Sequence, residues 1–121
     1  MTQERPASAV ERYLAALAVQ DWEALVGCLT ADVERIGPYN DVYLGREPYV
    51  AFLAETLAAL AGYELQVSRL IVANDTVVAE LSETVDTPTG RRRTDEAVVF
   101  DLSPAGLIRR VAVFLRRPTT G

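Results

Sequence analysis

The spacing of apolar residues changes once along this chain, at Gly62. Before Gly62, apolar residues recur three and four positions apart, which is the period of an amphipathic helix. After Gly62, apolar and polar residues alternate, which is the period of a half-buried strand. Helices followed by a run of strands indicate an α+β fold, in which the helices pack on one face of an antiparallel sheet.

Three segments before Gly62 have helical spacing. The first runs from Ala7 to Val19. The second is short and begins after Asp21, because aspartate commonly caps a helix N-terminus. The third runs from Glu47 to Leu60, and Gly62 suits its C-terminal cap. A short strand is predicted between the second and third helices, over Val33 to Ile36.

Four strands are predicted after Gly62, and turn-forming residues such as Asn74-Asp75 separate them. Strands that follow one another across short turns pair as antiparallel hairpins. The predicted strands are Glu64–Ala73, Thr76–Asp86, Arg92–Leu102 and Leu107–Arg116. A chain of 121 residues can bury a core of its own, so we expect a single domain over residues 1–121, ordered from about 7 to 117.

Charge, histidine content and cysteine content narrow the classes of function. A net charge of −5 argues against nucleic acid as a partner. The chain has no histidine, which removes histidine-dependent triads and nearly all zinc chemistry, so we predict neither a metal site nor a cofactor. The single cysteine, Cys28, is expected to be a buried, inert thiol. No segment resembles a signal peptide or a membrane span, so a cytoplasmic protein without a membrane partner is expected.

One predicted strand, VVAELSETVD from Val77 to Asp86, has two different faces. A period of two places side chains alternately on opposite faces. One face is mostly apolar, with Glu83 among its residues Val77, Ala79, Leu81 and Val85. The other face carries Val78, Glu80, Ser82, Thr84 and Asp86. The polar row therefore either faces water or lines a cavity.

Three pieces of the chain resemble one superfamily: AVERYLAALAVQDWEALVGCLTADVERIGP, YLGREPYVAFLAETL and GLIRRVAVFLRR. From Ala9 to Arg116, the chain resembles the nuclear transport factor 2-like superfamily, in its SnoaL-like, ketosteroid isomerase-like and limonene-epoxide hydrolase-like branch. The resemblance implies a conical, cystatin-like α+β barrel, in which three N-terminal helices pack on a curved antiparallel sheet around an internal pocket. It also implies a homodimer that forms through the convex face of the sheet.

In an alignment to this branch, the polar row of Val77–Asp86 faces the pocket and the apolar row lies on the convex face. A carboxyl group in an apolar cavity has a raised pKa, which suits Glu80 to acid-base catalysis. Tyr13 and Arg35 would then orient the substrate and stabilise charge. The other pocket residues that the resemblance implies are Trp22, Phe52, Ser82, Glu96, Val98, Phe100, Arg109, Val111 and Val113.

At most positions where this branch has its known catalytic residues, this sequence has a different residue type. Tyr13 matches the tyrosine that ketosteroid isomerases use to bind the oxyanion. Their general-base aspartate, however, falls on Gly37, and their second acid falls near Val98. The Asp-Arg-Asp residues of limonene-epoxide hydrolases fall on Ser82, Glu80 and Val113. Neither mechanism is therefore expected in its known form.

The function expected from the resemblance is that of a SnoaL-like enzyme acting without a cofactor on an apolar, oxygenated molecule, such as a polyketide or terpenoid intermediate. Its reaction would be cyclisation, isomerisation or epoxide opening. A non-catalytic module that binds a hydrophobic ligand, or a dimerisation domain, is the alternative.

The proposed site residues also have purely structural alternatives. Glu80 could form a buried salt bridge with an arginine, and Tyr13 could belong to the core. Glu96 could lie at a solvated edge, because it follows the charged run Arg91–Glu96. We expect Arg91–Arg93 to form a solvated hairpin tip.

Overall fold

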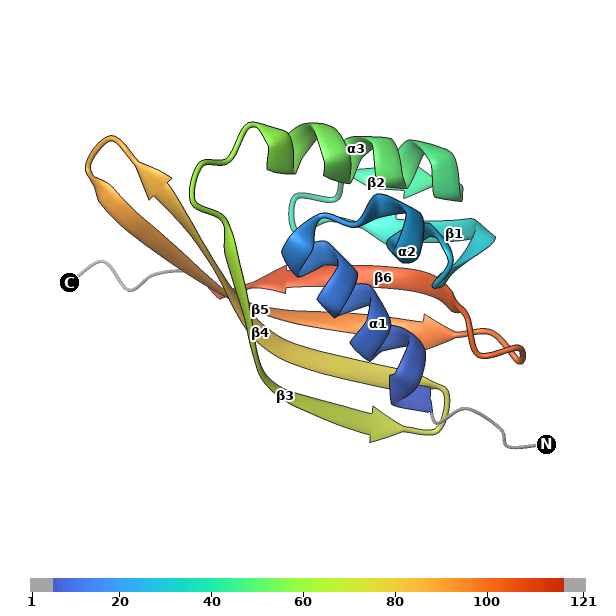
Figure 1. Ribbon diagram of the computed structural model, residues 1–121. Helices are drawn as coiled ribbons and strands as arrows, with labels where there is room; N and C mark the ends of the chain where they lie inside the picture. The colour runs from blue at the N-terminus through green and yellow to red at the C-terminus, as the bar shows by residue number, and fades with distance from the viewer. Residues whose placement is uncertain (1–5, 117–121) are drawn as a thin grey trace.

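In a computed structural model, which describes residues 6–116, three helices lie on one face of a six-stranded sheet (Figure 1). The helices are α1 (Pro6–Val19), α2 (Trp22–Val26) and α3 (Arg46–Ala58). The strands are β1 (Leu29–Ile36), β2 (Val42–Leu44), β3 (Glu64–Ala73), β4 (Thr76–Thr87), β5 (Gly90–Leu102) and β6 (Ile108–Leu115). The predicted α+β class is confirmed. Position 117, the end of the range expected to be ordered, lies outside the described residues.

The strand order in the sheet is β2-β1-β6-β5-β4-β3. Strands β3 to β6 form the predicted antiparallel meander. Strand β1 extends it through a parallel pairing with β6, and β2 pairs antiparallel to β1. The sheet is curved but not closed, since β2 and β3 are its two edges, so the implied barrel is an open cone.

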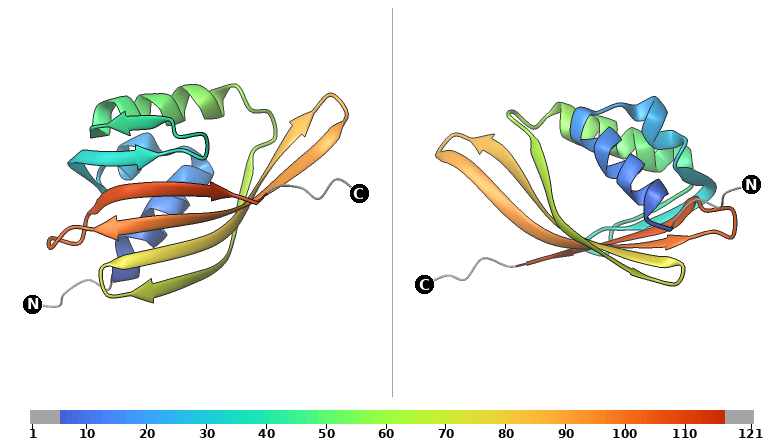
Figure 2. Two further views of the ribbon diagram at one scale, coloured as in Figure 1. Left: turned by 180° about the vertical axis from the view of Figure 1, so that it is seen from behind. Right: turned by 60° about the horizontal axis from the view of Figure 1, so that its bottom comes forward.

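The helices cover only the concave face of the sheet (Figure 2). Viewed from behind, the convex face carries no helix from residues 6–116. None of the helices in this part of the chain has the length and hydropathy of a membrane span. The space between the helices and the concave face holds the core.

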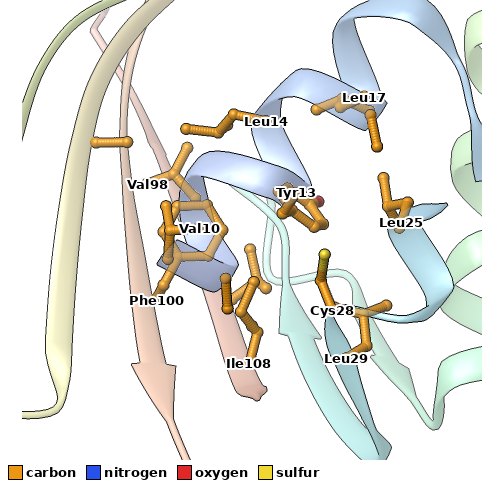
Figure 3. Close-up of a cluster of buried hydrophobic side chains, with 14 of the residues drawn as sticks. Val10, Tyr13, Leu14, Leu17, Leu25, Cys28, Leu29, Val98, Phe100 and Ile108 are labelled. Atoms are coloured by element: carbon orange, nitrogen blue, oxygen red, sulfur yellow. The ribbon is translucent and has the colours of Figure 1, made fainter. Parts of the chain in front are cut away.

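The core forms where α1 crosses strands β5 and β6 (Figure 3). Val10 of α1, Phe100 of β5 and Ile108 of β6 are all fully buried. Cys28 is buried beside them, as expected. These contacts fix which face of each strand points toward the helices.

The facing predicted for β4 is wrong. Val77 and Ala79 are fully buried under the helices, whereas Glu80 lies on the convex face. The register pairs Ala79 with Val98 and Leu81 with Glu96, so odd-numbered residues of β4 share the concave face with even-numbered residues of β5. Burial of the apolar row against the helices decides the facing, and a period of two then moves every residue of the polar row to the other side.

The hairpin of β4 and β5 projects beyond its neighbours in the sheet (Figure 1). Strand β3 pairs with β4 only as far as Thr84, and β6 pairs with β5 only as far as Glu96. We call residues 85–93, around the turn, the hairpin arm. Arg91 to Arg93 are exposed on it, as expected for a solvated tip.

Arg91 links the hairpin arm to the connection between α3 and β3. Its Nη1 donates to the backbone carbonyl of Gly62 at 3.1 Å and to Asp86 within the arm, and its Nη2 donates to Glu64 at 3.0 Å. The backbone N–H of Asp86 also donates to the carbonyl of Ala61. These contacts place the arm beside the open side of the concave face.

Candidate functional site

A cavity of about 340 Å³ lies between the helices and the concave face of the sheet. This volume is within the range of small-molecule sites. Most of its wall is apolar and comes from α1, α3 and strands β4, β5 and β6. Eight polar side chains line it: Tyr13, Arg35, Tyr49, Tyr63, Glu83, Arg92, Thr94 and Glu96.

Two glutamates from neighbouring strands meet in this cavity. Glu83 of β4 and Glu96 of β5 lie diagonally on the concave face, since Leu81 pairs with Glu96 and Glu83 pairs with Thr94. Burial, then a hydrogen bond to Glu83 and its negative charge, raise the pKa of Glu96 to about 9. These effects favour the protonated form of Glu96 at neutral pH, in which its hydroxyl can donate a hydrogen bond to Glu83.

Glu83 also accepts a hydrogen bond from the Tyr63 hydroxyl. Tyr63 follows the connection that Arg91 holds, and burial together with the charge of Glu83 raises its pKa. Two donors, Tyr63 and Glu96, thus orient the Glu83 carboxylate within the cavity wall. Such an arrangement holds a proton acceptor beside a proton donor.

A pair of tyrosines joins two helices at the inner end of the cavity. The hydroxyls of Tyr13 on α1 and Tyr49 on α3 share a hydrogen bond, and both residues are buried. Burial raises the pKa of Tyr13 well above its ordinary value and that of Tyr49 to about 12. The charge of Arg35 lowers both values and that of Glu83 raises both, so these charges act within one site.

We expect the two tyrosine hydroxyls to stabilise the fold only as a pair. Tyr13→Phe or Tyr49→Phe leaves the other hydroxyl buried without its partner, which should cost roughly 1–3 kcal/mol of unfolding free energy. The double variant removes both hydroxyls, so its loss should be smaller than the sum of the single losses. Urea unfolding of all four proteins measures this cycle, and strictly additive losses would contradict the expectation.

Arg35 of β1 brings a positive charge to the same cavity. Its Nη1 donates to Asp41 Oδ2 at 2.8 Å, and its guanidinium carbon lies 4.8 Å from the centre of the Phe52 ring. Its side chain is 11% exposed, and its Nε is buried without a hydrogen-bond partner among residues 6–116. Arg35 is therefore held in place while keeping an unused donor.

Gly37 leaves space for this arginine and its aspartate. A Cβ atom at Gly37 would lie 2.2 Å from Asp41 Oδ1 and 2.5 Å from Arg35 Nη1. Any side chain there would have to displace the ion pair. The position that aligns with the base of ketosteroid isomerases thus has no room for an acid while Arg35 and Asp41 stay paired.

The structure brings together some of the side chains predicted for the site. Those that line the cavity are Tyr13, Arg35, Glu96, Val98, Phe100, Val111 and Val113. The alternative that placed Glu96 at a solvated edge is wrong, because its side chain faces the cavity. Trp22 and Phe52 are instead half-buried residues that pack against the core, and the ring of Phe52 lies against the guanidinium of Arg35.

Three predicted residues lie elsewhere. Glu80 forms an exposed ion pair with Arg69 of β3 on the convex face, which raises the pKa of Arg69. Both predictions for Glu80 are therefore wrong: it does not line the cavity, and its salt bridge is exposed and not buried. Ser82 is buried on the same side of β4 as Glu80. Arg109 is exposed, because an irregularity in the pairing of β5 with β6 leaves it between paired residues.

Glu83, Tyr49 and Tyr63 were not predicted as site residues. Glu83 had a visible signal, since it is the one charged residue in the apolar row of VVAELSETVD. A charge on a buried face requires a partner or a function. Tyr49 and Tyr63 had no such signal, because their hydroxyls acquire partners only when distant segments meet.

Comparison with protein families matches residues 10–111 to the SnoaL-like domain. A search of curated proteins finds no match. The fold is similar to that of a Kribbella flavida protein assigned as a ketosteroid isomerase, with 21% identity, a TM-score of 0.84, and coverage of 96% of this chain and 81% of the other. At such identity, the likeness shows a shared fold alone.

Two further solved structures also have a similar fold. An LEH-like epoxide hydrolase of M. tuberculosis has 19% identity and a TM-score of 0.78, with 92% of this chain and 82% of the other covered. TerC, co-crystallised with polyporic acid, has 21% identity and a TM-score of 0.81, with 92% and 91% covered. Proteins with different reactions thus share this arrangement of helices and sheet.

Proposed function

This chain belongs to the SnoaL-like domain family, with a nuclear transport factor 2-like fold, and from that premise we propose that it is an enzyme of acid-base chemistry. Its substrate is a small, apolar, oxygenated molecule such as a polyketide or terpenoid intermediate. The reaction is a cyclisation, an isomerisation or an epoxide opening. One observation carries the proposal: two neighbouring carboxyl groups, Glu83 and Glu96, lie on the wall of an apolar cavity, where burial and the charge of Glu83 raise the pKa of Glu96.

The two glutamates suit opposite halves of a proton transfer. A pair whose surroundings separate the pKa values of its members can accept a proton at one group and donate one from the other. Glu83, oriented by Tyr63, is the proposed acceptor from a substrate C–H or from water. Glu96, whose pKa is raised to about 9, is the proposed donor. This pair takes the role that the sequence suggested for Glu80.

Tyr13 and Arg35 are proposed to stabilise an oxygen that gains negative charge. Both line the cavity, and although burial raises the pKa of the Tyr13 hydroxyl, the charge of Arg35 acts on it in the opposite direction. Donors fixed in a site that excludes water stabilise a developing oxyanion strongly. Tyr49 supports this role by holding the Tyr13 hydroxyl in position.

A substrate panel tests the proposal. Alpha-tetralone reports proton abstraction beside a carbonyl through deuterium incorporation, which NMR follows in heavy water, and styrene oxide reports epoxide opening. We expect turnover of at least one compound above the rate in buffer. We expect Val98→Trp, which fills the cavity, to abolish that turnover, since Val98 is a buried part of its wall.

A hydrophobic-ligand-binding module is the second candidate. The absence of an acid at Gly37 and at Val98, where ketosteroid isomerases carry theirs, favours it. In that case the native protein would bind apolar compounds and Val98→Trp would not, but no compound of the panel would be turned over. Binding and turnover measured on the same compounds separate the two functions.

We also propose a homodimer that forms through the convex face. The paired residues Ile71, Val78, Val99 and Ala112 make an apolar row across four strands on that face. Ile71 is 42% exposed, and Phe114 is 58% exposed nearby on β6. Val78 and Val99 are half-buried and Ala112 is buried, so the exposed apolar surface is largest at Ile71 and Phe114. Exposed apolar surface commonly marks protein interfaces.

Val99→Arg should therefore convert the protein to a monomer. The substitution places a charge in the middle of the row, where an interface would leave it desolvated and unpaired. Light scattering coupled to gel filtration measures the mass of both proteins. Glu23→Arg, on the surface of α2, is the control, and equal masses for native protein and Val99→Arg would contradict the dimer.

A further inference from the structure

The guanidinium of Arg35 is a buried polar group of the cavity whose donors are mostly unpaired. In the part of the chain that the structure describes, it donates one hydrogen bond, to Asp41, out of the five N–H donors of an arginine. Its Nε is fully buried and has no hydrogen-bond partner among residues 6–116. Buried donors are nearly always paired in folded proteins, so an unpaired one requires an explanation.

The surroundings of Arg35 fix the plane of its guanidinium. Asp41 binds one edge, and the ring of Phe52 lies against one face. Phe52 is itself stacked on Tyr43, with ring centres 4.4 Å apart and planes 27° apart. A planar donor held in this way is suited to an ionised oxygen, because carboxylates and enolates match its geometry.

The charges around Arg35 leave part of its positive charge available. Asp41 contacts only Nη1, and its side chain is 39% exposed, so water screens its charge. The raised pKa of Glu96, caused by burial and by the neighbouring Glu83, favours the neutral form of Glu96 and so limits the negative charge near Arg35. Within the hairpin arm, Arg92 also lines the cavity, and it forms no ion pair with any of residues 6–116.

We infer that the ligand of this cavity is an organic acid, bound as its anion with the ionised oxygen at Arg35. The class comprises apolar carboxylic acids and acidic enols or phenols, with the apolar body extending along the cavity toward Glu83 and Glu96. This inference rests on the proposed function, because it names the substrate class of the same site.

Two probes of equal shape test the inference without any turnover. The naphthoate anion and neutral naphthamide differ in charge and little else. Titration calorimetry on the native protein should give roughly tenfold or tighter binding of naphthoate, as expected for a charge-assisted hydrogen bond in a cavity. Equal affinities, or no binding of either probe, would overturn the inference.

Variants connect the preference to Arg35. In Arg35→Met, the ratio of the two affinities should fall to about one, whereas Arg69→Met on the convex face should leave the ratio unchanged. Arg35→Lys keeps the charge without the planar donor and should give an intermediate ratio. It also provides the test if Arg35→Met does not fold. A ratio that persists in both Arg35 variants would overturn the inference.

Glu83→Gln separates this inference from the proposed function. Because Glu83 is negative, its replacement should leave the preference for naphthoate intact or increase it. Turnover that survives Glu83→Gln would refute the proposed acid-base role while leaving the binding result valid. If the native protein binds naphthoate no better than naphthamide, the inference of an acidic ligand is refuted. The acid-base role would still be tested by the substrate panel.

Discussion

Glu83→Gln is expected to lower turnover by roughly 100- to 10,000-fold, the usual contribution of a general acid or base. Glutamine keeps the size of the side chain and can still hydrogen-bond to Tyr63 and Glu96. It cannot accept a proton, however. The loss should therefore appear in kcat, with little change in the binding of apolar ligands.

Glu80→Gln is the matched control for this experiment. It makes the same chemical change on the same strand, but its side chain lies on the convex face, paired with Arg69. We expect its kcat to equal that of the native protein. The opposite result, with Glu80→Gln inactive and Glu83→Gln active, would mean that Glu80 faces the cavity in solution, as the sequence analysis predicted.

The stability of the protein should fall as the pH rises. The pKa of Glu96 is raised from 4.5 to about 9 in the folded protein, so between these values the folded state holds a proton that the unfolded state releases. The free energy of unfolding therefore decreases with pH in this window, by up to about 1.4 kcal/mol per pH unit. This stabilisation is fully present below the lower value and is lost as the pH passes the upper one.

Glu96→Gln should remove most of this dependence. Glutamine has no proton to lose, yet it can still donate a hydrogen bond to Glu83. Urea unfolding at several pH values within the window gives the slope for each protein, and Glu80→Gln should keep the native slope. Because the proton belongs to the pair, an unchanged slope in Glu96→Gln would mean that another group titrates.

The order and type of the main elements could be predicted because they depend on the spacing of apolar residues within short segments. The helix over Ala7–Val19 and the meander after Gly62 follow directly from periods that local sequence displays. Strand β2, with only three residues, is too short to show a period.

The facing of the strands was harder, because it depends on what covers each face. Val98 and Val111 were placed correctly, since their apolar rows point toward the helices. Glu80 was misplaced because its facing was taken from an alignment. The pattern of its own strand indicated the opposite, since the apolar row on the other face is the one expected to be buried. Arg109 was misplaced because a pairing irregularity interrupts the alternation, and no sequence period reveals it.

The candidate site depends on contacts between segments far apart in the chain. The pairs Tyr13–Tyr49 and Tyr63–Glu83 join residues separated by 36 and 20 positions. Such pairs form only when the helices settle on the sheet, so one sequence cannot show them. Only Glu83 could have been noticed, as a charge that contradicts its apolar row.

The projecting hairpin arm has a consequence for how members of this fold diverge. Val85 and Arg92 line the cavity from the arm, yet residues 85–92 pair only with one another in the sheet. Insertions or deletions at the turn therefore leave the register of the core strands unchanged, and doubling a loop costs only about 0.6 kcal/mol in closure entropy. The rim of the binding site can thus change in length during evolution independently of the chemistry within it.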